Sequence, residues 1–85
     1  MMNSFNFLVS EQMRTMDKLL FLQSEIERCQ QVERELTELH DLTKLECVRE
    51  EILKMRTELR EIQQTFERQT NEVIQVYQQQ NQVFS

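Results

Sequence analysis

The second half of the chain carries apolar residues at alternating steps of three and four. The stripe runs through Leu45, Val48, Ile52, Met55, Leu59, Ile62, Phe66, Gln69, Val73, Val76, Gln80 and Val83, and all of these except the two glutamines are apolar. Held over several heptads, this spacing keeps one side of an α-helix facing a partner helix, as in a left-handed coiled coil. We therefore predict a helix over about residues 43–81 with this stripe as its seam.

A less regular stripe runs along the first half. It contains Phe5, Val9, Met13, Met16, Leu19, Leu20, Leu22, Ile26, Cys29, Val32, Leu36 and Leu39. It predicts a helix over about residues 4–40 whose phase slips between Cys29 and Val32. Glycine and proline, the residues that usually end or bend helices, are both absent. Strand-like alternation is missing as well, so we predict one all-α domain over residues 1–85.

The stripe changes step near residue 42, where the apolar residues are three apart each time. Thr43 and Glu46 have the spacing of a capping box at the start of a helix, and Leu42 and Cys47 occupy the positions of a hydrophobic staple. We therefore predict a turn at residues 41–43 and an antiparallel coiled-coil hairpin. The alternative is a single long coiled-coil helix, because no residue prevents a helix from continuing through the turn.

Folding at that turn would pair residues whose numbers sum to 84 or 85. The predicted pairs are Leu36 with Val48, Val32 with Ile52, Cys29 with Met55, Ile26 with Leu59, Leu22 with Ile62, and Leu19 with Phe66. Each pair is apolar on both sides. A core in a chain of 85 residues gives only a few kcal/mol of net stability. We therefore expect the hairpin to dimerise into a four-helix bundle.

The function that this pattern favours is a non-enzymatic coiled-coil interaction module, acting as an adaptor or small regulator. Its expected partners are a second copy of the chain, as a homodimer, and another coiled-coil protein. The residues expected at the interface are Val32, Leu36, Val48, Ile52, Met55, Leu59, Ile62, Phe66 and Val73. Phe21, Leu53 and Ile74 fall off the seam and indicate a further contact surface. A self-assembling structural protein is the alternative, because the same stripes serve self and foreign helices.

Charge and hydropathy exclude several classes of function. With 10 basic and 15 acidic side chains the net charge is −5, which argues against a nucleic-acid partner. The apolar run at residues 19–22 is far shorter than the ~20 residues that span a bilayer, so we expect no membrane partner. The first eight residues lack the basic start of a signal peptide. Together with a cysteine count of two, this predicts a cytoplasmic protein.

No residue pattern predicts catalysis or a bound cofactor. His40 is the single histidine, and a catalytic triad would have to be built around it on a connecting segment. Cys29, His40 and Cys47 lack the short spacings of a zinc site. The Glu-x-x-His motif of di-metal helical bundles fails because Thr37 stands three residues before His40. We predict no enzyme activity, no metal, no cofactor and no small-molecule ligand.

Two segments resemble a known family. Residues 8–30 (LVSEQMRTMDKLLFLQSEIERCQ) and 45–63 (LECVREEILKMRTELREIQ) resemble the YgaB-like family of small Bacillus proteins. The resemblance implies a small cytoplasmic bacterial protein and carries no catalytic residue over.

A second alternative function comes from the small helical-hairpin phosphatases of response regulators in bacilli, which carry a Ser-Gln-Glu-Leu-Asp motif. The nearest segment here is residues 13–17, Met-Arg-Thr-Met-Asp. It keeps the aspartate, Asp17, and replaces the serine, glutamine and glutamate of the motif. Under this alternative Asp17 or a neighbouring carboxylate would position water for attack on a phosphorylated partner.

Overall fold

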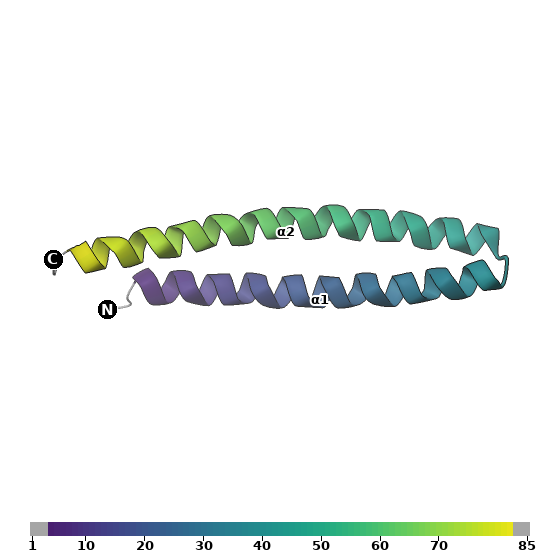
Figure 1. Cartoon of the computed structure of the whole chain (residues 1–85), viewed down its shortest axis with the longest axis horizontal. Helices are drawn as coiled ribbons and strands as arrows, with labels where there is room; N and C mark the ends of the chain where they lie inside the picture. Colours follow the sequence, from purple (N-terminus) through teal and green to yellow (C-terminus); the bar gives the residue numbers. More distant parts are fainter. Residues whose placement is uncertain (1–3, 83–85) are drawn as a thin grey trace.

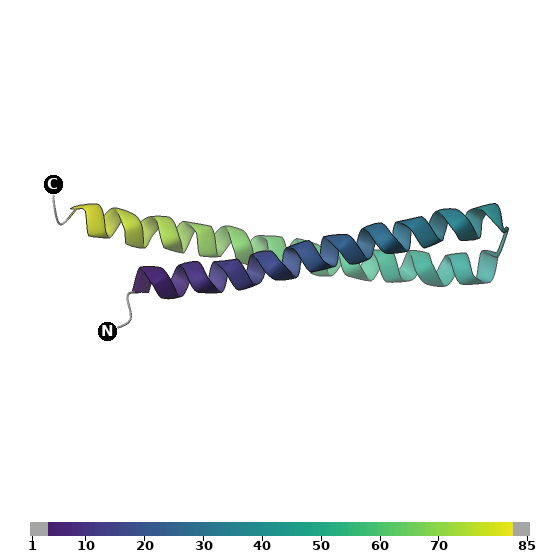
Figure 2. The same ribbon diagram turned by 90° about the horizontal axis from the view of Figure 1, so that it is seen from below.

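The computed structural model describes residues 4–82, with the side chains of residues 4–79, as an antiparallel pair of helices. Helix α1 spans Ser4–Glu38 and helix α2 spans Leu42–Gln82. The helices lie side by side along their whole length, cross at a shallow angle, and bring both termini to the same end (Figures 1 and 2). The molecule measures 65 × 18 × 17 Å. The predicted all-α hairpin is confirmed, and the alternative of one continuous helix is wrong.

The end of α1 is closed by a Schellman motif without glycine. The His40 amide donates to the Thr37 carbonyl (3.2 Å), and the Asp41 amide donates to the Leu36 carbonyl (3.1 Å). His40 therefore takes the left-handed conformation, with φ of 57°. Glycine usually holds this position, and histidine is among the other residues that tolerate it best. This is how a chain without glycine makes a tight turn.

Asp41 starts α2 as its N-cap. Its side-chain oxygen Oδ1 accepts a hydrogen bond from the Lys44 amide (3.2 Å), and its carbonyl accepts the first helical bond, from the Leu45 amide (3.0 Å). The predicted capping box is therefore wrong, because Thr43 already lies inside α2. The turn occupies residues 39–41 instead of 41–43. Aspartate caps at least as well as threonine, so the cap forms at the earlier position.

Replacing His40 with glycine should stabilise the hairpin. A left-handed non-glycine residue costs about 1–2 kcal/mol, and part of that gain is offset by the greater entropy of glycine in the unfolded chain. We expect the free energy of unfolding to rise by about 0.5–1 kcal/mol, measured by urea denaturation followed by circular dichroism. His40→Ala is the control, since alanine keeps the steric penalty. An equal gain from both variants would contradict the assigned backbone conformation.

The predicted seam of α2 is confirmed wherever its side chains are described. Leu45, Ile52 and Met55 are buried, and the remaining seam residues as far as Val76 are half-buried. The side chain of Gln80 and all of Val83 lie outside the described residues. This helix therefore presents one continuous stripe to α1.

The seam of α1 differs from the predicted one. The side chains turned toward α2 are Phe5, Leu8, Gln12, Thr15, Leu19, Leu22, Ile26, Cys29, Glu33 and Leu36, again at steps of three and four. The phase therefore does not slip near Cys29, because Glu33 takes the seam position and Val32 is left 38% exposed. Met13 and Leu20 are also exposed. The prediction followed apolar residues, whereas the seam passes through three polar ones.

Contacts between the helices set their register. Gln12 donates a hydrogen bond to Thr70, Glu33 pairs with Arg49 (3.1 Å), and the rings of Phe5 and Tyr77 lie 6.2 Å apart. The residue numbers in each of these pairs sum to 82. The α2 member of each pair comes one residue after a seam residue, so seam residues that face each other have numbers that sum to 81. Those layers are Leu36 with Leu45, Glu33 with Val48, Cys29 with Ile52, Ile26 with Met55, Leu22 with Leu59, Leu19 with Ile62, Thr15 with Phe66, and Gln12 with Gln69. The predicted sums of 84 and 85 are wrong by one layer, because the turn comes earlier.

Candidate interaction surfaces

The predicted interface residues lie mostly inside the hairpin. Eight of the nine, namely Leu36, Val48, Ile52, Met55, Leu59, Ile62, Phe66 and Val73, are buried or half-buried along the seam between α1 and α2. The ninth, Val32, lies beside the seam on the exposed surface. The seam is thus filled by the chain's own helices. A second chain that meets a closed hairpin must use other residues.

The two flanks of the seam differ in chemistry. The seam residues can be lettered a and d of a heptad, with Leu19 and Leu59 at a and Leu22 and Ile62 at d. Antiparallel packing then brings the e positions of both helices to one flank and the g positions to the other. The contacts of Thr70, Arg49 and Tyr77 with seam residues of α1 all lie on the e flank. The residues around Phe21 and Glu58 lie on the g flank. These flanks are the two long free faces of the hairpin.

The first flank is apolar near the open end of the hairpin. We call this surface the apolar flank; its members are Val9, Met13, Met16, Leu20, Ile74 and Tyr77. On α1 its residues are spaced four, three and four apart, so they form a second stripe beside the seam. Met13 is 64% exposed and Leu20 is 54% exposed. Exposed apolar side chains gathered on one face are typical of a protein–protein contact.

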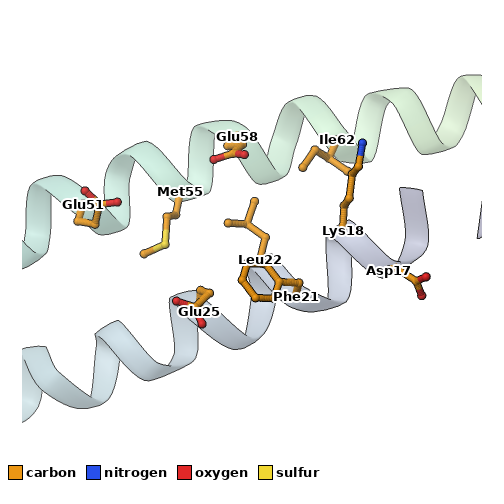
Figure 3. A pocket seen from close by; sticks show the side chains of 9 residues that line it. All are labelled: Asp17, Lys18, Phe21, Leu22, Glu25, Glu51, Met55, Glu58 and Ile62. Carbon is orange, nitrogen blue, oxygen red and sulfur yellow. The ribbon is translucent and has the colours of Figure 1, made fainter. Parts of the chain in front are cut away.

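The second flank is hollowed near the middle of the hairpin and is predominantly acidic. We call this surface the acidic groove; it is lined by Asp17, Lys18, Phe21, Leu22, Glu25, Glu51, Met55, Glu58 and Ile62. Figure 3 shows Leu22 and Met55 directed into the space between the helices, with Glu51 and Glu58 along the α2 rim. Phe21 stands at the α1 rim and is 67% exposed. The groove combines an apolar floor with carboxylates at its edges.

The carboxylates of the groove differ in whether they have an ion-pair partner. Glu25 pairs with Arg28 on its own helix (2.6 Å). Glu51 and Glu58 have no ion-pair partner among the described residues, and they stand seven residues apart on α2. Seven residues correspond to about 10.5 Å along a helix, so the two charges lie on the same face. This edge of the groove therefore carries two free negative charges.

The residues considered for catalysis are spread along the molecule. His40 lies in the turn, Cys29 is half-buried in the seam, and Cys47 is exposed near the start of α2. Within the described residues no group of three histidine, cysteine, aspartate or glutamate side chains is placed to hold a metal ion. Asp17 is exposed at the lip of the acidic groove, with its carboxylate directed away from α2 (Figure 3). The groove lining contains carboxylates and one lysine, and no hydroxyl, thiol or imidazole.

Sequence reasoning found part of these surfaces. Phe21, Leu53 and Ile74 were expected outside the seam, and they are 67%, 64% and 46% exposed. The apolar spacing predicts Met13, Met16 and Leu20 in the seam, but they belong to the apolar flank. The signal that separates them is the unbroken spacing of the observed seam, which becomes visible once Gln12 and Thr15 are admitted as seam residues. Neither helix, over residues 4–82, contains an apolar stretch that would reach across a bilayer.

Comparison with known proteins identifies the family. The model of the YgaB-like protein family matches residues 4–80. The protein of Bacillus subtilis (strain 168) named uncharacterized protein YgaB is 50% identical over 76 residues, which cover 89% of this chain and 67% of that protein. No solved structure matches the chain significantly. The resemblance of residues 8–30 and 45–63 is thereby confirmed, and the chain belongs to the YgaB-like family.

Proposed function

We propose that this protein is a non-enzymatic coiled-coil interaction module that forms a homodimer and serves as an adaptor or small regulator. The observation that carries the proposal is the apolar flank, which lies outside the seam and is not covered by the chain's own helices. In the proposed dimer, two hairpins pack these flanks together as a four-helix bundle. The proposed compartment is the cytoplasm, where the free thiols of Cys29 and Cys47 would stay reduced.

The thin core of the hairpin supports the proposal. Among the described residues, six apolar side chains are buried and no large side chain is below 2% exposure. A two-helix hairpin has a single contact plane, so each seam residue keeps an edge in water. Packing a second hairpin on the apolar flank would cover those edges and add about 25 cal/mol for each Å² of apolar surface removed from water. Small helical domains commonly reach adequate stability in this way.

The groove chemistry favours an interaction module over the phosphatase-like alternative. Asp17 is a single exposed aspartate whose carboxylate is directed away from α2. Its neighbours in the groove lining include no imidazole or hydroxyl to act with it, since they are three glutamates, one lysine and four apolar residues. A general base must also lie within reach of the proton it removes. We therefore propose no catalytic part for Asp17, whose carboxylate adds negative charge at the groove's edge.

Charge placed on the apolar flank should dissociate the dimer. Sedimentation equilibrium should give the wild-type chain twice the mass of one chain, and Met13→Glu/Leu20→Glu should raise the dimer Kd about a hundredfold or more. Both side chains are exposed in the hairpin, so the variant should stay helical by circular dichroism. Leu39→Glu/Leu42→Glu is the matched control, because these leucines are 75% and 74% exposed at the turn, away from the apolar flank.

Two results would overturn the proposed dimer. One is a wild-type chain that sediments as a monomer over the whole concentration range. The other is a dimer that both double variants weaken to the same extent, which would place the contact elsewhere.

A further inference from the structure

We propose that the acidic groove binds an amphipathic helix of a partner protein that carries two basic residues seven positions apart with apolar residues between them. This inference rests on the proposed function, because it names the kind of partner that an interaction module of this shape would hold. It concerns the flank opposite the apolar flank. A dimer built on one flank would thus leave the other free for the partner helix.

The apolar floor of the groove indicates which apolar side chains the partner helix would present. Leu22, Met55 and Ile62 lie along the base, and the exposed Phe21 ring forms one wall (Figure 3). A helix laid along a groove presents residues at steps of three and four to such a floor. Methionine adapts to side chains of different shape, and aromatic residues commonly anchor helix contacts. One or two leucine-like side chains of the partner would therefore insert beside Phe21 and Met55.

The carboxylates at the rim of the groove indicate the spacing of basic side chains on the partner helix. Glu51 and Glu58 lack ion-pair partners among the described residues and lie about 10.5 Å apart along α2. Lysine or arginine residues seven apart on the incoming helix have the same spacing and would meet both carboxylates. Asp17 adds a third free carboxylate, and Lys18 is the one positive side chain in the lining. The excess of negative charge selects against an acidic helix.

A second copy of this chain fits the groove less well. Its best matching segment is Arg49 and Arg56, which are seven apart with the exposed Leu53 between them. Arg49, however, is already paired with Glu33 at 3.1 Å. Contact between opposite flanks would also be heterologous and would build a ring or an open chain instead of a two-fold dimer. These points favour a different protein as the occupant.

The test uses the full-length chain and a synthetic probe. The probe is a fluorescently labelled helical peptide of about 20 residues, long enough to hold a helix, with arginines seven apart and leucines at the third and fourth positions between them. A peptide of the same composition with the arginines and leucines scrambled controls for charge alone. Binding is measured by fluorescence anisotropy at low and at physiological ionic strength, since salt weakens exposed ion pairs.

Matched variants locate the binding. We expect Phe21→Ala to weaken binding of the patterned peptide about tenfold. Glu51→Gln/Glu58→Gln should weaken it about fivefold or more and reduce its salt dependence. Glu50→Gln/Glu61→Gln removes the same charge from outside the groove, and Leu53→Ala removes an exposed apolar side chain on the opposite flank. Neither control should change the affinity by more than about twofold.

The outcomes separate this inference from the proposed function. Equal binding of the patterned and scrambled peptides, or equal losses in groove and control variants, would overturn the groove as a helix site. Loss of self-association, rather than of peptide binding, in Phe21→Ala would instead show that a second copy is the occupant. The dimer is measured separately by sedimentation, so a failed peptide experiment leaves the dimer proposal standing.

Discussion

Replacing Ile52 with aspartate should unfold the hairpin. Ile52 is 5% exposed and lies in the cluster formed with Leu22, Ile26 and Met55. The substitution removes a buried apolar side chain and places a carboxylate against the apolar side chains of this cluster. Losses of about 4 kcal/mol or more are expected from such a change. Because that is close to the whole stability of a small domain, the helical signal at 222 nm should largely disappear at 25 °C.

Leu53→Asp is the matched control for this substitution. It introduces the same charge one residue away, on a side chain that is 64% exposed outside the seam. Surface changes of this kind usually alter the free energy of unfolding by about 0.5 kcal/mol. Similar thermal melting of the two variants would contradict the assigned seam of α2.

The second large effect on stability is expected at a polar layer of the seam, near the end of the hairpin opposite the turn. Gln12 and Gln69 face each other in the seam, and Gln12 donates a hydrogen bond to Thr70. The Oε1 atom of Gln69 is buried and accepts no hydrogen bond from the described residues. A buried polar atom without a partner costs about 1–3 kcal/mol. We therefore expect Gln12→Leu/Gln69→Leu to raise the free energy of unfolding by about 2 kcal/mol, measured by urea denaturation.

The same substitution should make the register less specific. Layers that sum to 81 and layers that sum to 84 or 85 both pair apolar residues along most of the hairpin, as with Leu22 against Leu59 or Ile62. A polar layer disfavours the slipped arrangement, because a glutamine would then face an apolar residue. Disulfide trapping between cysteines introduced on facing positions should detect one register in the wild type and two in the variant. Gln64→Leu, on the exposed face of α2, is the control, and a loss of stability in the double variant would contradict the argument.

Particular residues show what the sequence can predict here and what it cannot. The stripe of α2 is apolar at nearly every step, so spacing alone located it correctly. The stripe of α1 passes through Gln12, Thr15 and Glu33. A pattern of apolar residues does not include these three positions, so it predicts the wrong seam beside each of them. Thr15 tolerates burial in the seam, where it is 8% exposed, because its hydroxyl donates to the Glu11 carbonyl (3.1 Å). Its methyl group therefore packs without leaving an unsatisfied donor.

The register depended on the turn more than on the stripes. An antiparallel seam with a regular heptad pairs apolar residues in several registers, so hydrophobic matching does not choose among them. The choice came from the position of the turn, and that depended on Asp41 as the N-cap and on His40 in a left-handed conformation. Histidine rarely marks a turn in sequence, because glycine or asparagine usually holds that position. The acidic groove then follows from the register, since this register brings Glu25 and Glu58 to the same flank of the hairpin.

The most direct test of the whole account is an isotope-filtered nuclear Overhauser experiment on an equal mixture of ¹³C-labelled and unlabelled chains. We expect methyl groups of Leu22 and Leu59 to contact each other within one chain. We expect Met13 and Leu20 methyls to contact protons of the other, unlabelled chain. Contacts between Leu22 and Leu59 of different chains would show that the seam joins two molecules, and the closed hairpin with a free apolar flank would then be wrong.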